Sequence, residues 1–261
     1  MRRTLHNHLP LITLLASCFT TSGAVIYQES FTGSGANPLH GTAPDVAPGA
    51  ETWNANPGWS ETGVVLSPGG DWNAFVPFTP ATGKNGRLYT LTATLDPDTV
   101  IGPGTDWLAL GFTASDGTSI DFWQGPNDAA PWVLMREDPT DFNVIRTGGG
   151  PGLAAGGNFN LNPDVPGPVE LSVTLNTRFS SWRAEWFADG NFLASYVYPS
   201  QPTITHVGFG SQGASIGGTV ADFSLTSVEV ALPEPSTAAF SVFGLLLLRA
   251  LRKRSDEPAY T

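Results

Sequence analysis

Four tryptophans lie in polar segments of the chain, where an aromatic ring is placed to contact a sugar. Three are surrounded by Asn, Gly, Pro and Ser, and the fourth begins the run Trp-Gln-Gly-Pro-Asn-Asp at the end of an expected strand. A flat ring can cover the apolar face of a pyranose while neighbouring Asp, Asn and Gln side chains hydrogen-bond its hydroxyls. The candidate carbohydrate-binding residues are therefore Trp53, Trp59, Trp72 and Trp123. The alternative is that these rings pack against the ends of a folded core.

Carboxylates at a spacing suited to glycoside hydrolysis are scarce. A glycosidase holds two carboxylates about 5 to 10 Å apart, and alternate residues on one strand face lie roughly 6.6 Å apart. The nearest pairs are Glu185 with Asp189, and Glu137 and Asp138 with Asp141. The first pair crosses into a turn and the second lies within one loop. We therefore expect solvated turn acids and no catalysis.

Histidine and cysteine, the usual zinc ligands, are almost absent after residue 24. That part of the chain contains His40, His206 and no cysteine, so a zinc site is not expected. His206 lies in an alternating strand pattern, and we expect it to pack there. Calcium prefers hard oxygen ligands, so we expect no cofactor unless it is calcium, for which the candidate ligands are Asp96, Asp98, Asp128 and Asp138. Asp residues are also common in turns that bind no metal.

The charge of the chain is strongly negative in its middle part. The 261 residues have a formal net charge of −11, and residues 25–232 carry six basic and 20 acidic residues, a net charge of −14. A surface with so few basic residues has no phosphate-binding footprint, so nucleic acid is excluded as an expected partner. Neutral sugars, cations and other proteins remain.

The elements that position these residues are predicted to be β-strands. Short apolar runs alternate with Gly, Pro, Asn and Asp, and no apolar period of 3.6 residues is sustained. In the segment 87–95, Tyr89, Leu91, Ala93 and Leu95 point to one face, and Leu88 and three threonines point to the other. Strands are predicted at 25–30, 63–66, 74–78, 87–95, 107–113, 119–123, 132–136, 143–146, 169–175, 181–187, 192–197, 205–209 and 220–230.

Two tight hairpins and one long loop are predicted between these strands. Asp116-Gly117 and Asp189-Gly190 each lie between two predicted strands, and Asp-Gly is a typical type I′ hairpin turn. Residues 148–168 are rich in Gly, Pro and Asn, and we expect a long loop there. Trp107, Trp182 and Trp186 lie in apolar strand patterns and are predicted to belong to the core.

The strand segments resemble the concanavalin A-like, laminin-G-like jelly rolls. The resemblance rests on residues 107–112, 169–175, the hairpin 182–193, 206–210 and 220–225. It implies an all-β fold, a two-sheet antiparallel jelly-roll sandwich, formed by residues 25–232 as one domain. This fold hosts lectins, hydrolases and modules without activity, so it does not by itself predict a function.

The first 24 residues have the features of a signal peptide. Arg2 and Arg3 precede an apolar run at 9–19, and Ser22-Gly23-Ala24 provides small residues for cleavage. The mature chain would then begin at Val25. In the competing interpretation, Leu15-Ala16-Ser17-Cys18 resembles a bacterial lipobox, and Cys18 would be lipidated. Cys18 is the only cysteine, so no intramolecular disulfide can form and stability must come from packing.

Residues 233–261 resemble the PEP-CTERM sorting signal of Gram-negative bacteria. A Pro-Glu-Pro motif is followed by an apolar run at 238–248 and by a basic cluster. The resemblance implies recognition by an exosortase, a membrane protease or transpeptidase that removes the helix near the motif. The recognition residues would be Pro233, Glu234 and Pro235, and the cytoplasmic basic anchor would be Arg249, Arg252, Lys253 and Arg254. The alternative is an amphipathic terminal helix docked on the domain.

The apolar segment near the C-terminal side is short for a membrane span. Residues 238–251 would form a helix of about 21 Å, against a hydrocarbon core of about 30 Å. This length predicts a temporary anchor in the inner membrane. The basic cluster would stay in the cytoplasm, which places the acidic domain outside it.

Together these features predict an exported protein of the cell envelope, outer surface or extracellular polysaccharide matrix. We expect a non-catalytic carbohydrate-binding or structural module, with an exosortase and extracellular polysaccharide as partners. Two alternatives stay open. A polysaccharide-active glycoside hydrolase or lyase would need two carboxylates converging in a groove, and a protein–protein adhesion module would need a flat exposed apolar patch.

Overall fold

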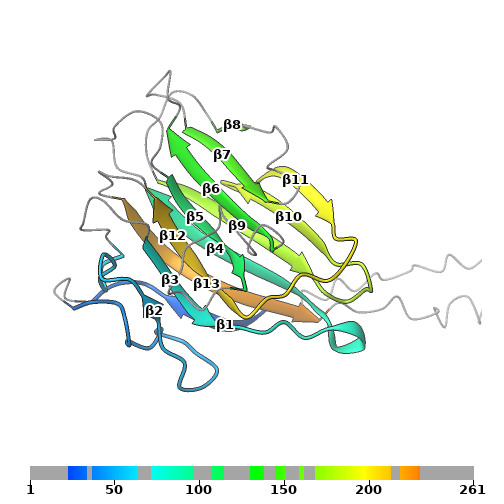
Figure 1. Cartoon of the computed structure of the whole chain (residues 1–261), viewed down its shortest axis with the longest axis horizontal. Helices are drawn as coiled ribbons and strands as arrows, with labels where there is room; N and C mark the ends of the chain where they lie inside the picture. Colours follow the sequence, from blue (N-terminus) through cyan, green and yellow to red (C-terminus); the bar gives the residue numbers. More distant parts are fainter. Residues whose placement is uncertain are drawn as a thin grey trace, which may run out of the picture.

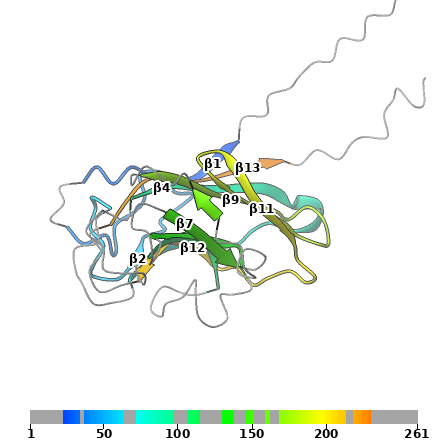
Figure 2. The ribbon, with the colours of Figure 1, turned by 90° about the horizontal axis from the view of Figure 1, so that it is seen from above.

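Two antiparallel β-sheets packed face to face form the body of the protein (Figures 1 and 2). The computed structural model describes residues 23–33, 37–63, 72–96, 107–114, 130–137, 145–150, 159–161, 168–212 and 218–229. The predicted strands at 63–66, apart from Gly63, and at 119–123 lie outside these residues, as does the Asp116-Gly117 turn. The predicted all-β, two-sheet antiparallel jelly-roll sandwich is confirmed.

The first sheet has six strands, and every neighbouring pair is antiparallel. The first strand in the sequence, β1, forms one edge of this sheet, and the last strand, β13, pairs with it. In spatial order its strands are β1 (Ala24–Glu29), β13 (Thr219–Glu229), β4 (Arg87–Asp96), β9 (Val169–Asn176), β10 (Arg183–Ala188) and β11 (Asn191–Val197).

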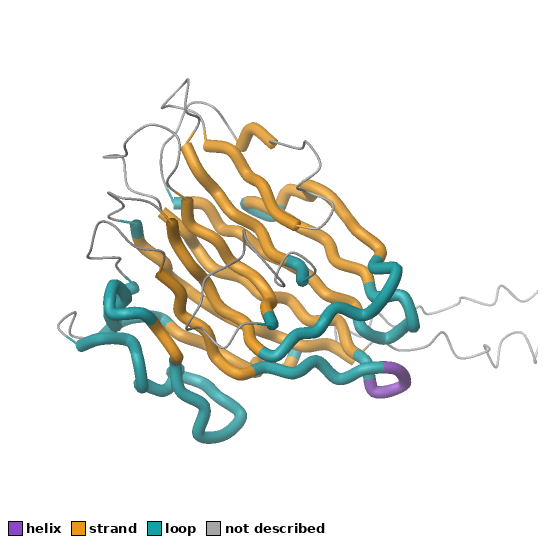
Figure 3. The backbone as a smooth tube through the Cα atoms, viewed as in Figure 1, coloured by secondary structure: helices purple, strands orange, loops and turns teal. Residues whose placement is uncertain are grey.

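The second sheet has seven strands and is also antiparallel throughout. Its spatial order is β2 (Asn54–Ala55), β3 (Trp72–Pro77), β12 (His206–Gln212), β5 (Trp107–Thr113), β6 (Trp132–Glu137), β7 (Ile145–Gly150) and β8 (Phe159–Leu161). Among the described residues the one helical element is a 3-10 turn, η1 (Gly83–Asn85), drawn purple in Figure 3.

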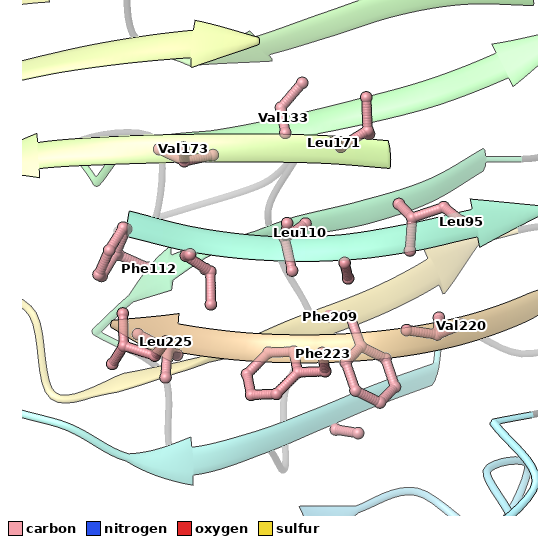
Figure 4. Close-up of a cluster of buried hydrophobic side chains, with 14 of the residues drawn as sticks. Leu95, Leu110, Phe112, Val133, Leu171, Val173, Phe209, Val220, Phe223 and Leu225 are labelled. Atoms are coloured by element: carbon pink, nitrogen blue, oxygen red, sulfur yellow. The ribbon is translucent and has the colours of Figure 1, made fainter. Parts of the chain in front are cut away.

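The hydrophobic core fills the space between the sheets, as the alternation in β4 predicts. Tyr89, Leu91, Ala93 and Leu95 are buried, and the residues between them are partly exposed. Figure 4 shows side chains of both sheets meeting there, among them Leu110 of β5, Phe209 of β12 and Phe223 of β13. Because burial of apolar surface is the main favourable term in folding, this layer supplies the stability that no disulfide provides.

The hairpin between β10 and β11 confirms the Asp-Gly turn prediction. Asp189 and Gly190 have φ values of 47° and 72°, the left-handed conformations that a type I′ turn requires at both central positions. The carboxylate of Asp189 also accepts a hydrogen bond from the backbone N–H of Glu170, at 3.0 Å. Asp189 is therefore a structural turn residue.

Two strands were not predicted, and both are short. β2 has two residues, and β8 has three residues within the segment 148–168 that the sequence indicates as a loop. The same segment also contributes Gly148 to Gly150 to the end of β7. Three consecutive glycines show no polar–apolar alternation, so the sequence does not predict a strand here. They extend β7 because they pair with the neighbouring strand β6.

The predicted terminal signals fall mostly outside the described residues. Of residues 1–24 only Gly23 and Ala24 are described, and Ala24 opens β1. The Pro233–Pro235 motif and the basic cluster from Arg249 to Arg254 are not among them. In the part of the chain that the structure describes, no helix is long and apolar enough to cross a membrane.

Candidate ligand-binding site

Trp53 and Trp59 lie in the core, which corrects their prediction as sugar-binding residues. Their side chains are 1% and 0% exposed. Both pack on Phe209, with ring centroids 5.3 Å and 4.7 Å away, and Trp53 also contacts Phe223 at 5.1 Å. Rings without exposed surface cannot cover a pyranose. The polar residues around them in sequence belong to loops that turn both rings inward.

The other two candidate tryptophans differ in their positions. Trp72 opens β3, is partly buried and packs against the core cluster. Its indole N–H is buried and has no acceptor among the described residues. Trp123 lies outside the described residues. Sugar binding by Trp72 and Trp123 stays a prediction.

The candidate calcium ligands are not brought together by the described residues. Asp96 is the last residue of β4, and Asp98, Asp128 and Asp138 lie outside the described part. Within that part, no group of three or more His, Cys, Asp or Glu side chains is arranged to hold a metal ion.

The candidate catalytic pair Glu185 and Asp189 has structural partners instead. Glu185 forms an ion pair with Arg183 at 2.8 Å on the outer face of β10, and Asp189 holds the turn described above. The second candidate group is Glu137, Asp138 and Asp141. Glu137 is the last residue of β6, and the two aspartates lie outside the described residues.

A buried carboxylate that sequence reasoning missed lies at the end of β1. Glu29 Oε1 accepts a hydrogen bond from the N–H of Phe31 at 2.9 Å, and Oε2 accepts one from Trp53 Nε1 at 3.3 Å. Burial raises the pKa of Glu29, these two bonds lower it, and the charges of Asp45 and Glu61 raise it. Glu29 therefore orients Trp53 in the core. Tyr27 and Glu29 are alternate residues of β1, so both side chains point into the core. This alternation is the sequence signal that could have predicted a buried Glu29.

A pocket opens at the end of the sandwich where β1 begins and β13 ends. Its cavity volume is about 300 Å³, at the lower end of the range of small-molecule sites. Its walls come from parts of the chain that are distant in sequence: Ile26 and Tyr27 of β1, Pro48 and Glu51 of the loop before β2, Pro77 of β3, Phe78, Thr79 and Ala81 after it, Arg87 and Tyr89 of β4, and Ser227 of β13. We call this the Tyr27–Tyr89 pocket.

Its two tyrosines are held by backbone groups at the end of β3 and in the segment that follows it. The hydroxyl of Tyr27 donates to the carbonyl of Pro77 at 2.5 Å, and the hydroxyl of Tyr89 accepts from the N–H of Ala81 at 2.8 Å. Burial raises the pKa of Tyr27 to about 12, with a further contribution from the charge of Glu51. Burial also raises the pKa of Tyr89. Both phenols are therefore neutral at physiological pH.

Thr177 fixes the segment that forms one wall of the pocket. Its buried hydroxyl donates to the carbonyl of Ala81 at 2.6 Å and accepts from the N–H of Arg87 at 3.1 Å. Its own N–H donates to the carbonyl of Arg87 at 3.0 Å. Gly86 permits this close approach, because a Cβ at that position would lie 2.3 Å from the carbonyl oxygen of Thr177.

Two charged side chains line the pocket, and they differ in their partners. Arg87 Nη2 pairs with Glu229 Oε1 at 3.1 Å at the protein surface. Glu51 Oε2 is buried and has no hydrogen-bond donor among the described residues. The pocket thus combines aromatic rings, hydroxyl groups and one carboxylate with an unsatisfied oxygen. No local motif marks Glu51, because its loop reaches β1 through the backbone pairing of Gln28 with Val46.

Comparisons with known proteins give similarities of structure alone. No family model matches the chain, and no curated protein matches it. Among solved structures, an endo-1,3-beta-glucanase from Streptomyces sioyaensis is 12% identical, with a TM-score of 0.48 over 80% of this chain and 97% of that one. The carbohydrate recognition domain of Emp47p is 13% identical, with a TM-score of 0.46 over 78% and 96%. A Bacillus subtilis protein of unknown function with a galectin-like fold has 13% identity and a TM-score of 0.41 over 80% and 98%.

Proposed function

We propose that this chain is an exported, non-catalytic carbohydrate-binding module and that its sugar ligand occupies the Tyr27–Tyr89 pocket. The observation that carries the proposal is the composition of that pocket. Its lining places the apolar Ile26, Pro48 and Pro77 beside polar side chains of Glu51, Thr79 and Ser227. Sugar hydroxyls need directional partners of this kind beside an apolar surface.

The charge of the domain supports a ligand without negative charge. Residues 25–232 carry a net charge of −14, and Arg87, the one basic side chain among the described pocket-lining residues, is paired with Glu229. Anionic polymers would be repelled by such a surface, whereas neutral and cationic sugars are not. The proposed ligand is therefore a neutral or basic polysaccharide segment of the extracellular matrix.

The terminal segments support export and sorting as part of the same proposal. Residues 1–24 would be removed as a signal peptide, and an exosortase would recognise Pro233, Glu234 and Pro235 while the basic residues from Arg249 to Arg254 hold the tail in the cytoplasm. Mass spectrometry of the protein isolated from cell surfaces tests this. Terminal peptides beginning at Val25 and ending near residue 235 are expected, and an intact tail would contradict the sorting proposal.

Binding is tested with the full chain in a glycan screen, followed by titration calorimetry on the sugars that bind. Ser227→Ala removes a hydroxyl that lines the pocket, and we expect a loss of about 1 kcal/mol in binding free energy, or roughly fivefold in affinity. Ser224→Ala is the matched control, because Ser224 lies on the opposite face of the same strand. Equal affinities of the two variants would contradict the pocket as the binding site.

The absence of catalysis is tested on the same sugars. An assay for new reducing ends should detect no product during prolonged incubation with the full chain. Release of product would overturn the non-catalytic proposal and favour a polysaccharide-active enzyme, which needs a second carboxylate near the bound sugar.

A further inference from the structure

The carboxylate of Glu51 is the one charged group of the described pocket lining that lacks a counterpart. Its Oε2 atom is buried without a donor among the described residues. Glu29 provides a contrast within the same protein, because each of its oxygens accepts a hydrogen bond. A buried polar group without a partner is costly, and the cost is larger for a charge. A ligand that supplies a donor or a positive charge would therefore gain binding free energy here.

The described residues that line the pocket do not supply that positive charge to Glu51. Arg87 lines the same pocket, but its guanidinium pairs with Glu229. Glu51 also lies close enough to Tyr27 for its negative charge to add to the effect of burial in raising the pKa of that phenol. The carboxylate of Glu51 therefore gives the pocket a negative potential, which favours a cationic ligand.

We propose that the pocket selects sugars that carry a protonated amino group, such as the 2-amino-2-deoxyhexose units of a deacetylated polysaccharide. In this arrangement the ammonium group pairs with Glu51, and the sugar hydroxyls face the polar lining at Thr79 and Ser227. The inference rests on the proposed function and adds the chemical class of the sugar. An N-acetylated unit lacks the charge, and a uronate would face Glu51 with like charge.

The test compares two disaccharides that differ only at nitrogen. Titration calorimetry with the full chain uses the glucosamine disaccharide and its di-N-acetylated form, at a pH where the amino groups are protonated. A short ligand is needed because a long polycation would bind any acidic protein. We expect the free amine to bind at least tenfold more tightly, and we expect this preference to be lost in Glu51→Gln.

The matched control is Glu170→Gln, which removes one negative charge from the exposed face of β9. It should keep the preference for the amine. Glu51→Gln keeps the size and shape of a partly exposed side chain, so we expect the variant to fold, and urea unfolding checks this. The preference of the unaltered chain is measured without any substitution, so it tests the proposal even where a variant does not fold.

Each other outcome separates this inference from the proposed function. If both disaccharides bind equally, or if Glu51→Gln keeps the preference, the amino-sugar inference is overturned and the carbohydrate-binding function stands. If no sugar binds at all, both are overturned. If calcium binds in a manner that Glu51→Gln abolishes, the pocket is a metal site and the inference is again overturned.

Discussion

Glu29 and Glu51 are two carboxylates of one acidic domain that have different environments. Both oxygens of Glu29 accept hydrogen bonds, and they fix Trp53 and the backbone at Phe31. One oxygen of Glu51 is buried without a donor in the described part of the chain. A carboxylate with its bonds satisfied serves the fold, whereas an unsatisfied one at a pocket is available to a ligand.

The raised pKa of Glu29 predicts how stability depends on pH. The folded state holds the proton more tightly than the unfolded state, so the contribution of Glu29 is fully present below its ordinary pKa of 4.5. It is lost as the pH rises through the higher pKa of the folded state. We expect the free energy of unfolding of Glu29→Gln to fall less over this rise in pH than that of the unaltered chain.

Urea unfolding at a series of pH values from acid to neutral measures this difference. The comparison uses the slope of the free energy of unfolding against pH. The amide in Glu29→Gln cannot accept both hydrogen bonds, so the variant is expected to lose about 1–3 kcal/mol of stability at every pH. Glu170→Gln has an exposed carboxylate and should follow the unaltered chain. Identical slopes for all three proteins would show that Glu29 does not titrate differently on folding.

The 3-10 turn η1 and the start of β4 depend on contact with Thr177. Gly86→Ala would place a methyl group against the backbone carbonyl of Thr177, which a flexible side chain cannot relieve. Overpacking of this kind typically costs about 1–3 kcal/mol. We expect lower thermal stability together with weaker sugar binding, because the same segment carries the Ala81 N–H that holds Tyr89.

Lys84→Ala in the same turn is the control for this prediction. The Arg178 side chain bonds to the backbone carbonyl of Lys84 and not to its side chain, so the substitution leaves that bond in place. Thermal unfolding and calorimetric titration should give values close to those of the unaltered chain. Equal behaviour of Gly86→Ala and Lys84→Ala would contradict the role of the close contact.

How far the sequence predicts these elements depends on whether their signals are local. The alternation in β4 and the Asp189-Gly190 turn are properties of neighbouring residues, and both are confirmed. Trp53 and Trp59 lie in polar loops, yet they are buried because Phe209 and Phe223, far along the chain, receive them. The pocket joins residues from 26 to 227. No local pattern contains such a site, so only the folded chain reveals it.

The molecule as a whole is stabilised by the aromatic layer between its sheets. Phe209 contacts Phe31, Trp53, Trp59 and Phe223. Phe209→Ala removes a fully buried ring, and we expect a loss of about 3–5 kcal/mol in the free energy of unfolding. Phe192→Ala is the control, because that side chain is 58% exposed at the edge strand β11, and a change within about 0.5 kcal/mol is expected.

Chemical denaturation followed by tryptophan fluorescence measures both variants, since the buried indoles of Trp53 and Trp59 report on the core directly. A similar loss in the two variants would mean that the layer around Phe209 does not hold the sheets together.

The first and last strands of the domain lie side by side, with Ala24 opposite Ser227, and the pocket opens beside them. A polymer held in the pocket and an attachment at either end of the domain would therefore pull on the same edge of the molecule. Tension would pass through the few residues of β1, β13 and β4 that line the pocket, and it would not cross the sandwich. The strands farther from this edge would carry none of that load.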